Sequence, residues 1–336
     1  MAPKKIMSER NIFTIAVLAI VFAAAAMTAA AQTSAAPGDG SGPAHNTWSS
    51  GAAMPTARSG VATGVIKGKV YVVGGATNSD VVSVNEIYNP KKNTWTTGVP
   101  MPTARWVPAS AVVNNILYVI GGCTNACPGG TGALSVVEAF DPATDTWSTT
   151  SPLPTATYGM YAVAVKGIIY VVGGYVPGVG RVGTIYSYNP ATDTWAQEAS
   201  MKVGRSTPAT GALGTTILAS GGFGNSGTVS DNERYSVAKN SWKTVASDPT
   251  GRSAPCFAGI AGQLYVAGGD AGSGPLDLLE AYSLKANSWT TLASMPQAVD
   301  YPGSADVGSR LYCFGGSSNG TLFQGTVYND VQIYQP

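Results

Sequence analysis

Arginine side chains recur at one position of a repeating pattern, and guanidinium groups gathered around a central opening would bind an anion such as a carboxylate sugar or an acidic peptide. Glutamates recur at a second position in the same repeats, and two repeats lack both residue types. Those two repeats carry Thr157 with Tyr186 and Val299 with Gln332. Because a buried charge without a partner is strongly destabilising, joint presence and joint absence favour structural ion pairs over an anion site. The predicted pairs are Arg58–Glu86, Arg105–Glu138, Arg205–Glu233 and Arg252–Glu280.

Aromatic and acidic side chains occupy variable positions next to the repeated arginines and glycines. Aromatic rings pack against sugars, and a carboxylate can bind hydroxyl groups. These side chains would line a central pocket for a sugar or another small polar ligand, and the competing interpretation is ordinary packing between repeats. The predicted ligand-binding residues are Trp106, Tyr158, Tyr175, Asp300 and Tyr301. No catalytic residue is identified, although an acid or base would have to be Asp300, Asp270 or a tyrosine.

Other kinds of site are disfavoured by residue counts and spacing. The single histidine, His45, lies at the edge of the repeats, which argues against a catalytic triad and against a histidine metal site. The scattered aspartates lack the spacing of a calcium loop, and we expect neither a metal nor a cofactor. Cys123 and Cys127 could form a small loop disulfide in an oxidising compartment. Cys256 and Cys313 lie in expected strands, where buried free thiols are the default expectation.

The elements that would position these residues come from a sixfold repeat. Paired glycines and single tryptophans each recur six times, and both series step by 47, 52, 48, 47 and 47 residues. A period of about 50 residues with short strands is typical of a β-propeller. The glycine pairs begin at Gly74, Gly121, Gly173, Gly221, Gly268 and Gly315, and the tryptophans are Trp48, Trp95, Trp147, Trp195, Trp242 and Trp289. The sequence therefore predicts an all-β, six-bladed β-propeller with four antiparallel strands in each blade.

Each blade is expected to contain four strands, a to d from the centre outward. In the first repeat these are residues 60–66, 69–73, 84–88 and 94–97. All variation in repeat length lies between the glycine pair and strand c, where 14, 15 or 19 residues separate the first glycine from the strand-c aromatic. The b-to-c loops and the d-to-a crossings emerge at the same end, here called the loop face. Variable loops on a constant scaffold often bind ligands, and unconstrained drift in loop length is the alternative.

The repeat resembles the kelch repeat over residues 46–336. It combines the glycine pair with a Glu-x-Tyr-Asn-Pro segment and a tryptophan seven residues after the tyrosine. Phe140 replaces the tyrosine in one copy, and two other copies replace the Asn-Pro. The likeness does not extend to the galactose oxidases, kelch-like propellers whose copper site needs histidine ligands. A repeated Ser-x-Asp-x-Gly-x-x-Trp box, as in the sialidases, is also missing from the sequence.

The two ends of the repeat region predict how the ring closes. Residues 332–336 align with strand c and are followed by no strand d, whereas residues 46–48 match a strand d with no blade before them. We therefore expect the N-terminal strand to complete blade six, which leaves no open edge. This predicts one propeller domain over residues 46–336, a flexible linker over residues 32–45 and a targeting segment over residues 1–31.

The targeting segment has the features of a signal peptide. Lys4, Lys5 and Arg10 precede an apolar run at 12–27, and three alanines at 29–31 provide a cleavage site. The alternative is an uncleaved anchor, since about 20 apolar residues can span a bilayer. The expected location is therefore the periplasm, the extracellular space or the cell surface, with membrane contact only if the segment stays uncleaved.

Charge and architecture together limit the expected functions. The 336 residues carry 19 basic and 18 acidic side chains, and no basic stripe is present to bind a nucleic acid. The favoured function is an exported binding module for a protein or glycan, acting through the loop face. One alternative is a carbohydrate-active enzyme resembling the N-acetylneuraminate epimerases (mutarotases), which rests on analogy; another is a cell-surface or adhesion component. Two acids facing one cavity would favour the enzyme, and the oligomeric state is not predicted.

Overall fold

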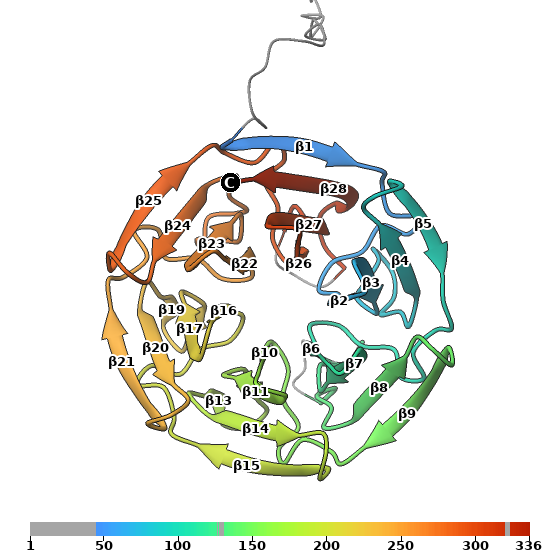
Figure 1. Ribbon diagram of the computed structural model, residues 1–336, viewed down its shortest axis with the longest axis horizontal. Coiled ribbons are helices and arrows are strands. Elements are labelled where there is room, and N and C mark those ends of the chain that lie inside the picture. Colours follow the sequence, from blue (N-terminus) through green and yellow to red (C-terminus); the bar gives the residue numbers. More distant parts are fainter. Residues whose placement is uncertain (1–44, 126, 128–130, 320–322) are drawn as a thin grey trace, which may run out of the picture. The chain divides into compact units, whose positions relative to one another are not determined.

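The computed structural model describes residues 45–125, 127, 131–319 and 323–336. These residues form six four-stranded antiparallel sheets and two two-stranded ribbons. The six sheets surround a common centre as blades (Figure 1), which confirms the predicted all-β, six-bladed propeller. The predicted signal peptide at 1–31 and the predicted linker, apart from His45, lie outside the described residues. Within the described part of the chain, no helix is long and apolar enough to cross a membrane.

The strands follow one another outward through each blade. Blades one to three comprise β2 (Ala62–Ile66), β3 (Lys69–Val73), β4 (Asn85–Asn89) and β5 (Thr94–Thr97); β6 (Ala109–Val113), β7 (Ile116–Ile120), β8 (Val137–Asp141) and β9 (Thr146–Thr150); β10 (Tyr161–Val165), β11 (Ile168–Val172), β14 (Ile185–Asn189) and β15 (Thr194–Glu198). Blades four to six comprise β16 (Ala209–Leu213), β17 (Thr216–Ser220), β20 (Asn232–Ser236) and β21 (Ser241–Val245); β22 (Cys256–Ile260), β23 (Gln263–Ala267), β24 (Leu279–Ser283) and β25 (Ser288–Leu292); β26 (Gly303–Val307), β27 (Arg310–Ser317), β28 (Val327–Gln335) and β1 (Thr47–Gly51).

Blade six closes the ring with strands from both ends of the repeat region. β1 pairs antiparallel with β28 (Figure 1), and the strand register places Trp48 opposite Tyr334. The Trp48 and Tyr334 ring centroids are 5.2 Å apart, and Trp48 Nε1 donates a hydrogen bond of 2.7 Å to Ala293 O of blade five. The predicted closure by the N-terminal strand is therefore confirmed. β28 therefore has a hydrogen-bonded neighbour on each side, β27 and β1.

The repeated tryptophans tie each outer strand to the preceding blade. In blade one, Trp95 lies opposite Tyr88, and the two ring centroids are 5.0 Å apart. Trp95 Nε1 donates to Ala52 O at 2.8 Å, while the Tyr88 hydroxyl donates to Asn93 Oδ1 at 2.7 Å. The seven-residue spacing is constant because it places the aromatic ring and the tryptophan opposite each other across the c-to-d turn.

The four repeated arginines lie inside their blades. Arg58 is fully buried, with Nη2 at 2.7 Å from Glu86 Oε2 and Nη1 donating to Gly74 O at 2.8 Å and Val84 O at 3.1 Å. Burial lowers the pKa of Arg58, and the attraction of Glu86 opposes that shift. The equivalent ion pairs are Arg105–Glu138, Arg205–Glu233 and Arg252–Glu280. Each guanidinium thus joins strand c to the glycine pair and is enclosed within its blade.

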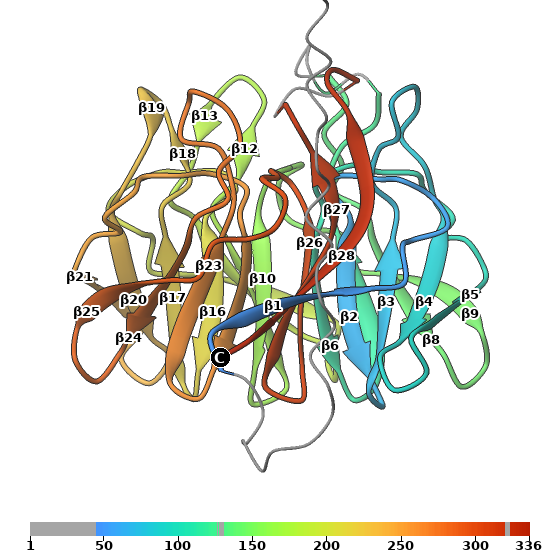
Figure 2. The same cartoon turned by 90° about the horizontal axis from the view of Figure 1, so that it is seen from above.

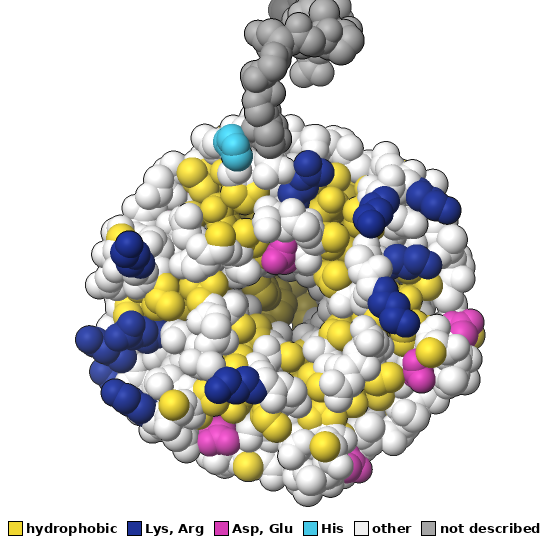
Figure 3. All heavy atoms as spheres, in the orientation of Figure 1, with side chains coloured by type: hydrophobic (Ala, Val, Ile, Leu, Met, Phe, Trp, Pro, Cys, Tyr) yellow, Lys and Arg dark blue, Asp and Glu magenta, His cyan; other side chains and the backbone are white. Residues whose placement is uncertain are grey.

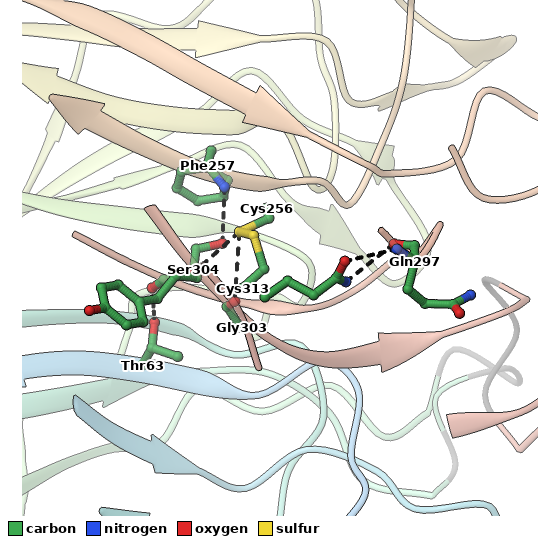
Figure 4. Close-up of a disulfide and its surroundings, with 9 residues drawn as sticks. Thr63, Cys256, Phe257, Gln297, Gly303, Ser304 and Cys313 are labelled. Carbon is green, nitrogen blue, oxygen red and sulfur yellow. Dashed lines mark hydrogen bonds between the residues drawn. A yellow bond between two sulfur atoms is a disulfide. The ribbon is translucent and has the colours of Figure 1, made fainter. Parts of the chain in front are cut away.

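Both cysteine pairs form disulfides. Cys123 and Cys127 are linked within the b-to-c loop of blade two. Cys256 and Cys313 link strand a of blade five to strand b of blade six, so the expectation of free thiols at these positions was wrong (Figure 4). Their Cα atoms are 5.7 Å apart, a separation that suits a disulfide. The two strands belong to different repeats, so alignment of the repeats alone did not pair them.

Candidate ligand-binding site

A closed belt of backbone hydrogen bonds surrounds the centre of the propeller. Each belt residue donates its N–H to the carbonyl of the equivalent residue in the preceding blade, at 2.6 to 3.0 Å. All belt residues have a positive φ, between 44° and 65°. They are Gly60, Val107, Gly159, Thr207, Ala254 and Tyr301. Branched side chains rarely adopt this conformation, so the mutual hydrogen bonds hold a strained backbone in place. The belt also explains why β2 begins at Ala62 and not at the predicted residue 60.

The variable positions singled out in the sequence pair with each other in every blade. The residue before each belt residue forms an isolated antiparallel bridge with the residue after the glycine pair. The bridges are Ser59–Ala76, Trp106–Cys123, Tyr158–Tyr175, Ser206–Phe223, Ser253–Asp270 and Asp300–Ser317. Because the belt residue comes next in the chain, these pairs lie around the belt. The d-to-a crossings and b-to-c loops therefore come together at the ring centre.

A cavity of about 360 Å³, here called the central pocket, lies among these loops. Trp106, Tyr158, Tyr175 and Tyr301 of the predicted set line it, whereas Asp300 does not. The rest of the lining comprises Val107, Gly159, Arg181, Ser206, Thr207, Phe223, Ser253, Asp270 and Asn319. Figure 2 shows the ribbons β12 (Tyr175–Val176), β13 (Gly180–Arg181), β18 (Phe223–Gly224) and β19 (Gly227–Thr228) together at one end of the molecule. A volume of this size suits a small-molecule ligand.

The pocket aromatics form two close pairs. Trp106 and Tyr301 have ring centroids 5.1 Å apart, as have Tyr158 and Tyr175. Trp106 is largely buried, and its Nε1 has no hydrogen-bond partner among the described residues. Burial raises the pKa of Tyr158 and of Tyr301, so both hydroxyls are protonated and able to donate at neutral pH. The pocket therefore offers aromatic surface together with hydrogen-bond donors.

Asp300 lies behind the pocket wall, which corrects its expected place in the lining. The side chain is fully buried, and Ser317 Oγ donates to its Oδ1. Its Oδ2 has no hydrogen-bond partner within the described part of the structure. Burial raises the pKa of Asp300 to about 6, and repulsion by Asp270 adds to the shift against the opposing hydrogen bond from Ser317. Asp270 is the carboxylate that reaches the lining.

Arg181 is a pocket residue that sequence reasoning missed. Its guanidinium carbon lies 5.3 Å from the centroid of Tyr175 and 4.6 Å from that of Phe223, and its Nε is buried with no partner among the described residues. Arg181 lies in a loop of variable length and has no equivalent in the repeat, so the pattern gave no signal for it.

The carboxylate of Asp270 is held in place by backbone groups of its own loop. Asp270 Oδ1 accepts hydrogen bonds from Gly272 N at 2.6 Å and from Gly274 N at 3.1 Å.

A separate channel runs along the inner strands of the blades. It has a volume of about 440 Å³ and is lined by strand-a residues from all six blades. Tyr161 of blade three and Phe257 of blade five meet edge to face with centroids 4.7 Å apart, which narrows the channel. Figure 3 shows a hollow at the centre of one face, with hydrophobic side chains in its interior. The channel contains few charges and offers little chemistry.

The comparisons with known proteins agree with this architecture. Residues 159–336 match the family model described as the KLHDC2/KLHL20/DRC7 Kelch-repeats domain, and residues 57–102 and 108–154 match the Kelch motif. No curated protein matches the sequence. The solved structure titled "Structure of YjhT" aligns with a TM-score of 0.70 at 17% identity, covering 84% of this chain and 96% of that one, which is a likeness of fold. Six kelch-type blades and these matches show that the chain belongs to the kelch-repeat family.

Proposed function

We propose that the protein is a binding module whose central pocket takes a sugar or a similar small polar ligand. The observation that carries the proposal is the meeting of aromatic rings, Arg181 and Asp270 around one cavity of about 360 Å³. Aromatic faces pack against sugar rings, while fixed charges and hydroxyls bind their polar groups. A larger protein or glycan partner would engage the same loops from outside.

Export of the protein forms part of this proposal. Disulfides persist mainly in oxidising compartments, and the two disulfides involve all four cysteines of the chain. A location in the periplasm, outside the cell or on its surface therefore fits the signal-like segment at 1–31. A role as a cell-surface or adhesion component would use the same pocket with a ligand on another cell.

A thermal-shift screen of residues 32–336 against neutral and acidic sugars, N-acetylneuraminate included, tests the binding proposal. A ligand at a hundredfold excess over its Kd stabilises the folded state by about 2.7 kcal/mol, so we expect a rise in Tm of several degrees. Tyr158→Ala should abolish the rise, and Lys166→Ala, in the turn between strands a and b of blade three, serves as the control. No shift with any sugar would refute the sugar ligand and direct the search to macromolecular partners.

The enzyme alternative is retained because two carboxyl groups lie close to one pocket. Asp270 lines the cavity, and Asp300, with its pKa raised to about 6, lies behind the wall. A raised pKa of this kind suits an acid or base near neutral pH. NMR observation of sugar anomer exchange would test an epimerase-like activity. Exchange accelerated by the wild type and not by Asp300→Asn would support this activity. Exchange at the uncatalysed rate in the presence of the wild type would contradict it and favour a binding module without a reaction of its own.

A further inference from the structure

Blade three lacks the buried ion pair that fills the interior of four other blades. In blade one, the Arg58 guanidinium occupies this position and donates to the carbonyls of Gly74 and Val84. In blade three, Thr157 stands in place of the arginine and Tyr186 in place of the glutamate. Thr157 Oγ1 donates to the nearby Thr155 O at 2.8 Å, so it does not replace the reach of a guanidinium.

The missing pair leaves a cavity of about 200 Å³ inside blade three. Its lining comprises Leu153, Thr155, Thr157, Met160, Val171, Gly173, Val176, Val179, Val182, Thr184 and Tyr186. Among these described residues, none carries a charge, and the walls are chiefly aliphatic. Gly173 is the counterpart of Gly74, and no side chain in the described part of the chain donates to its carbonyl oxygen. The cavity is therefore apolar with a backbone acceptor in its wall.

Blade six has also lost the pair, and its replacements make different contacts. Val299 stands there in place of the arginine and is fully buried. Gln332 replaces the glutamate; its Oε1 accepts from Gln297 N at 2.9 Å, and its Nε2 donates to Gln297 O at 3.2 Å. The side-chain amide of Gln332 is thus satisfied within blade six, whereas blade three has open space where the ion pair of the other blades would lie. The replacements in blade three, Thr157 and Tyr186, both line its cavity.

The wall of the blade-three cavity includes an exposed side chain of the loop face. The hairpin formed by β12 and β13 contributes Val176 and Val179 to the lining. Val179 is 73% exposed, an unusual position for a large aliphatic side chain in this protein. A ligand could therefore enter beside Val179 without the blade unfolding.

We propose that this cavity binds a neutral aromatic ring with one hydrogen-bond donor, a phenol-class group. An apolar cavity of about 150 Å³ in another protein stays dry and binds benzene, so about 200 Å³ admits a substituted ring. The ligand hydroxyl would donate a hydrogen bond to Gly173 O, whose equivalents in four other blades accept from arginine. A cation is disfavoured because Tyr186 has replaced the carboxylate. The ring could belong to a free phenol or to a tyrosine side chain of a peptide.

NMR titration of the chain with p-cresol, toluene and N-acetyltyrosinamide tests the proposal. We expect saturable binding of p-cresol with shifts at Thr157, Gly173 and Tyr186. One hydrogen bond is worth about a factor of 2 to 10, so toluene should bind several-fold more weakly. Binding of N-acetyltyrosinamide as well would support a tyrosine side chain as the source, and binding of p-cresol alone would support a free phenol.

A filled-cavity variant provides the decisive comparison. Thr157→Arg with Tyr186→Glu restores the pair of the other blades, and p-cresol should then bind at least about tenfold more weakly. Thr157→Leu fills the space without new charges and should weaken p-cresol binding to a similar extent. It provides the test if the double variant does not fold. Absence of saturable p-cresol binding, equal affinity for toluene and p-cresol, or unchanged affinity in a folded filled variant would overturn the proposal. Sugar binding at the central pocket is measured separately, so its failure would not affect this result.

Discussion

The blade interiors and the central pocket are made from consecutive residues of the same repeat, yet they vary in opposite ways. In blade two, Arg105 forms a buried ion pair, Trp106 lines the pocket and Val107 belongs to the belt. The arginine position is occupied alike in four blades, whereas the next position carries serine, tryptophan, tyrosine or aspartate. One short segment therefore combines a constant scaffold with a variable surface. Substitutions at the first position should alter stability, and those at the second should alter binding.

Arg105→Ala should give the largest effect on the scaffold side of this comparison. It leaves Glu138 buried without its partner, and breaking a buried pair in this way costs about 3–5 kcal/mol. We expect a marked fall in Tm in thermal unfolding followed by circular dichroism, with ligand binding retained below the transition. Arg310→Ala, at an exposed residue, is the control. An unchanged Tm would show that the ion pairs are not structural.

Removal of the disulfide between blades five and six should have the next largest effect. The Cys256–Cys313 disulfide closes a loop whose ends are 57 residues apart in the sequence, and replacing both cysteines by alanine opens it. Loss of a disulfide typically lowers the free energy of unfolding by about 2–4 kcal/mol. Replacing both Cys123 and Cys127 should cost less, because that loop spans four residues. Denaturant unfolding of the two double variants checks this order. Equal losses would mean that the inter-blade disulfide adds no more than the loop disulfide.

Asp300→Asn should change how stability depends on pH. The pKa of Asp300 is raised to about 6 in the folded protein, against about 3.9 in an unfolded chain, so the folded state binds the proton more tightly. Its destabilising contribution is absent below about pH 4, grows up to about pH 6 and is complete above that, at roughly 1–3 kcal/mol. The pKa of Asp248 is also raised to about 6, so this residue titrates in the same pH range. The test is therefore to measure the free energy of unfolding against pH for the wild type and for Asp300→Asn, and to compare the two curves. Parallel curves between about pH 4 and pH 6 would contradict the prediction.

The repeat predicted those features that recur at fixed offsets. Ring closure by residues 46–48 followed from an unfinished last blade, and Arg58 could be matched with Glu86 because the two residue types are gained and lost together. Three features escaped this reasoning. Positive φ at Val107 and Thr207 opposes local preference and is imposed by the belt. Arg181 has no equivalent in other repeats, and the Cys256–Cys313 contact joins different repeats.

Arg181→Met should have the smallest effect on stability and is the sharpest test of the pocket side. The charge of Arg181 lies over Tyr175 and Phe223, and such a contact is worth about 0.5–1 kcal/mol at an accessible site. Methionine keeps the aliphatic packing, so the Tm should move by about 2 °C or less.

Binding should respond more strongly than stability to this change. Among the described pocket residues, Arg181 is the one cation, so an acidic sugar such as N-acetylneuraminate should lose about tenfold in affinity, which corresponds to about 1.4 kcal/mol. A neutral sugar should lose much less, and Arg181→Lys should recover part of the acidic-sugar affinity. Calorimetric titration of both sugars with both variants measures the difference. An equal loss for both sugars would show that Arg181 shapes the aromatic wall, in which case it belongs with the scaffold and the separation between the two regions fails at this residue.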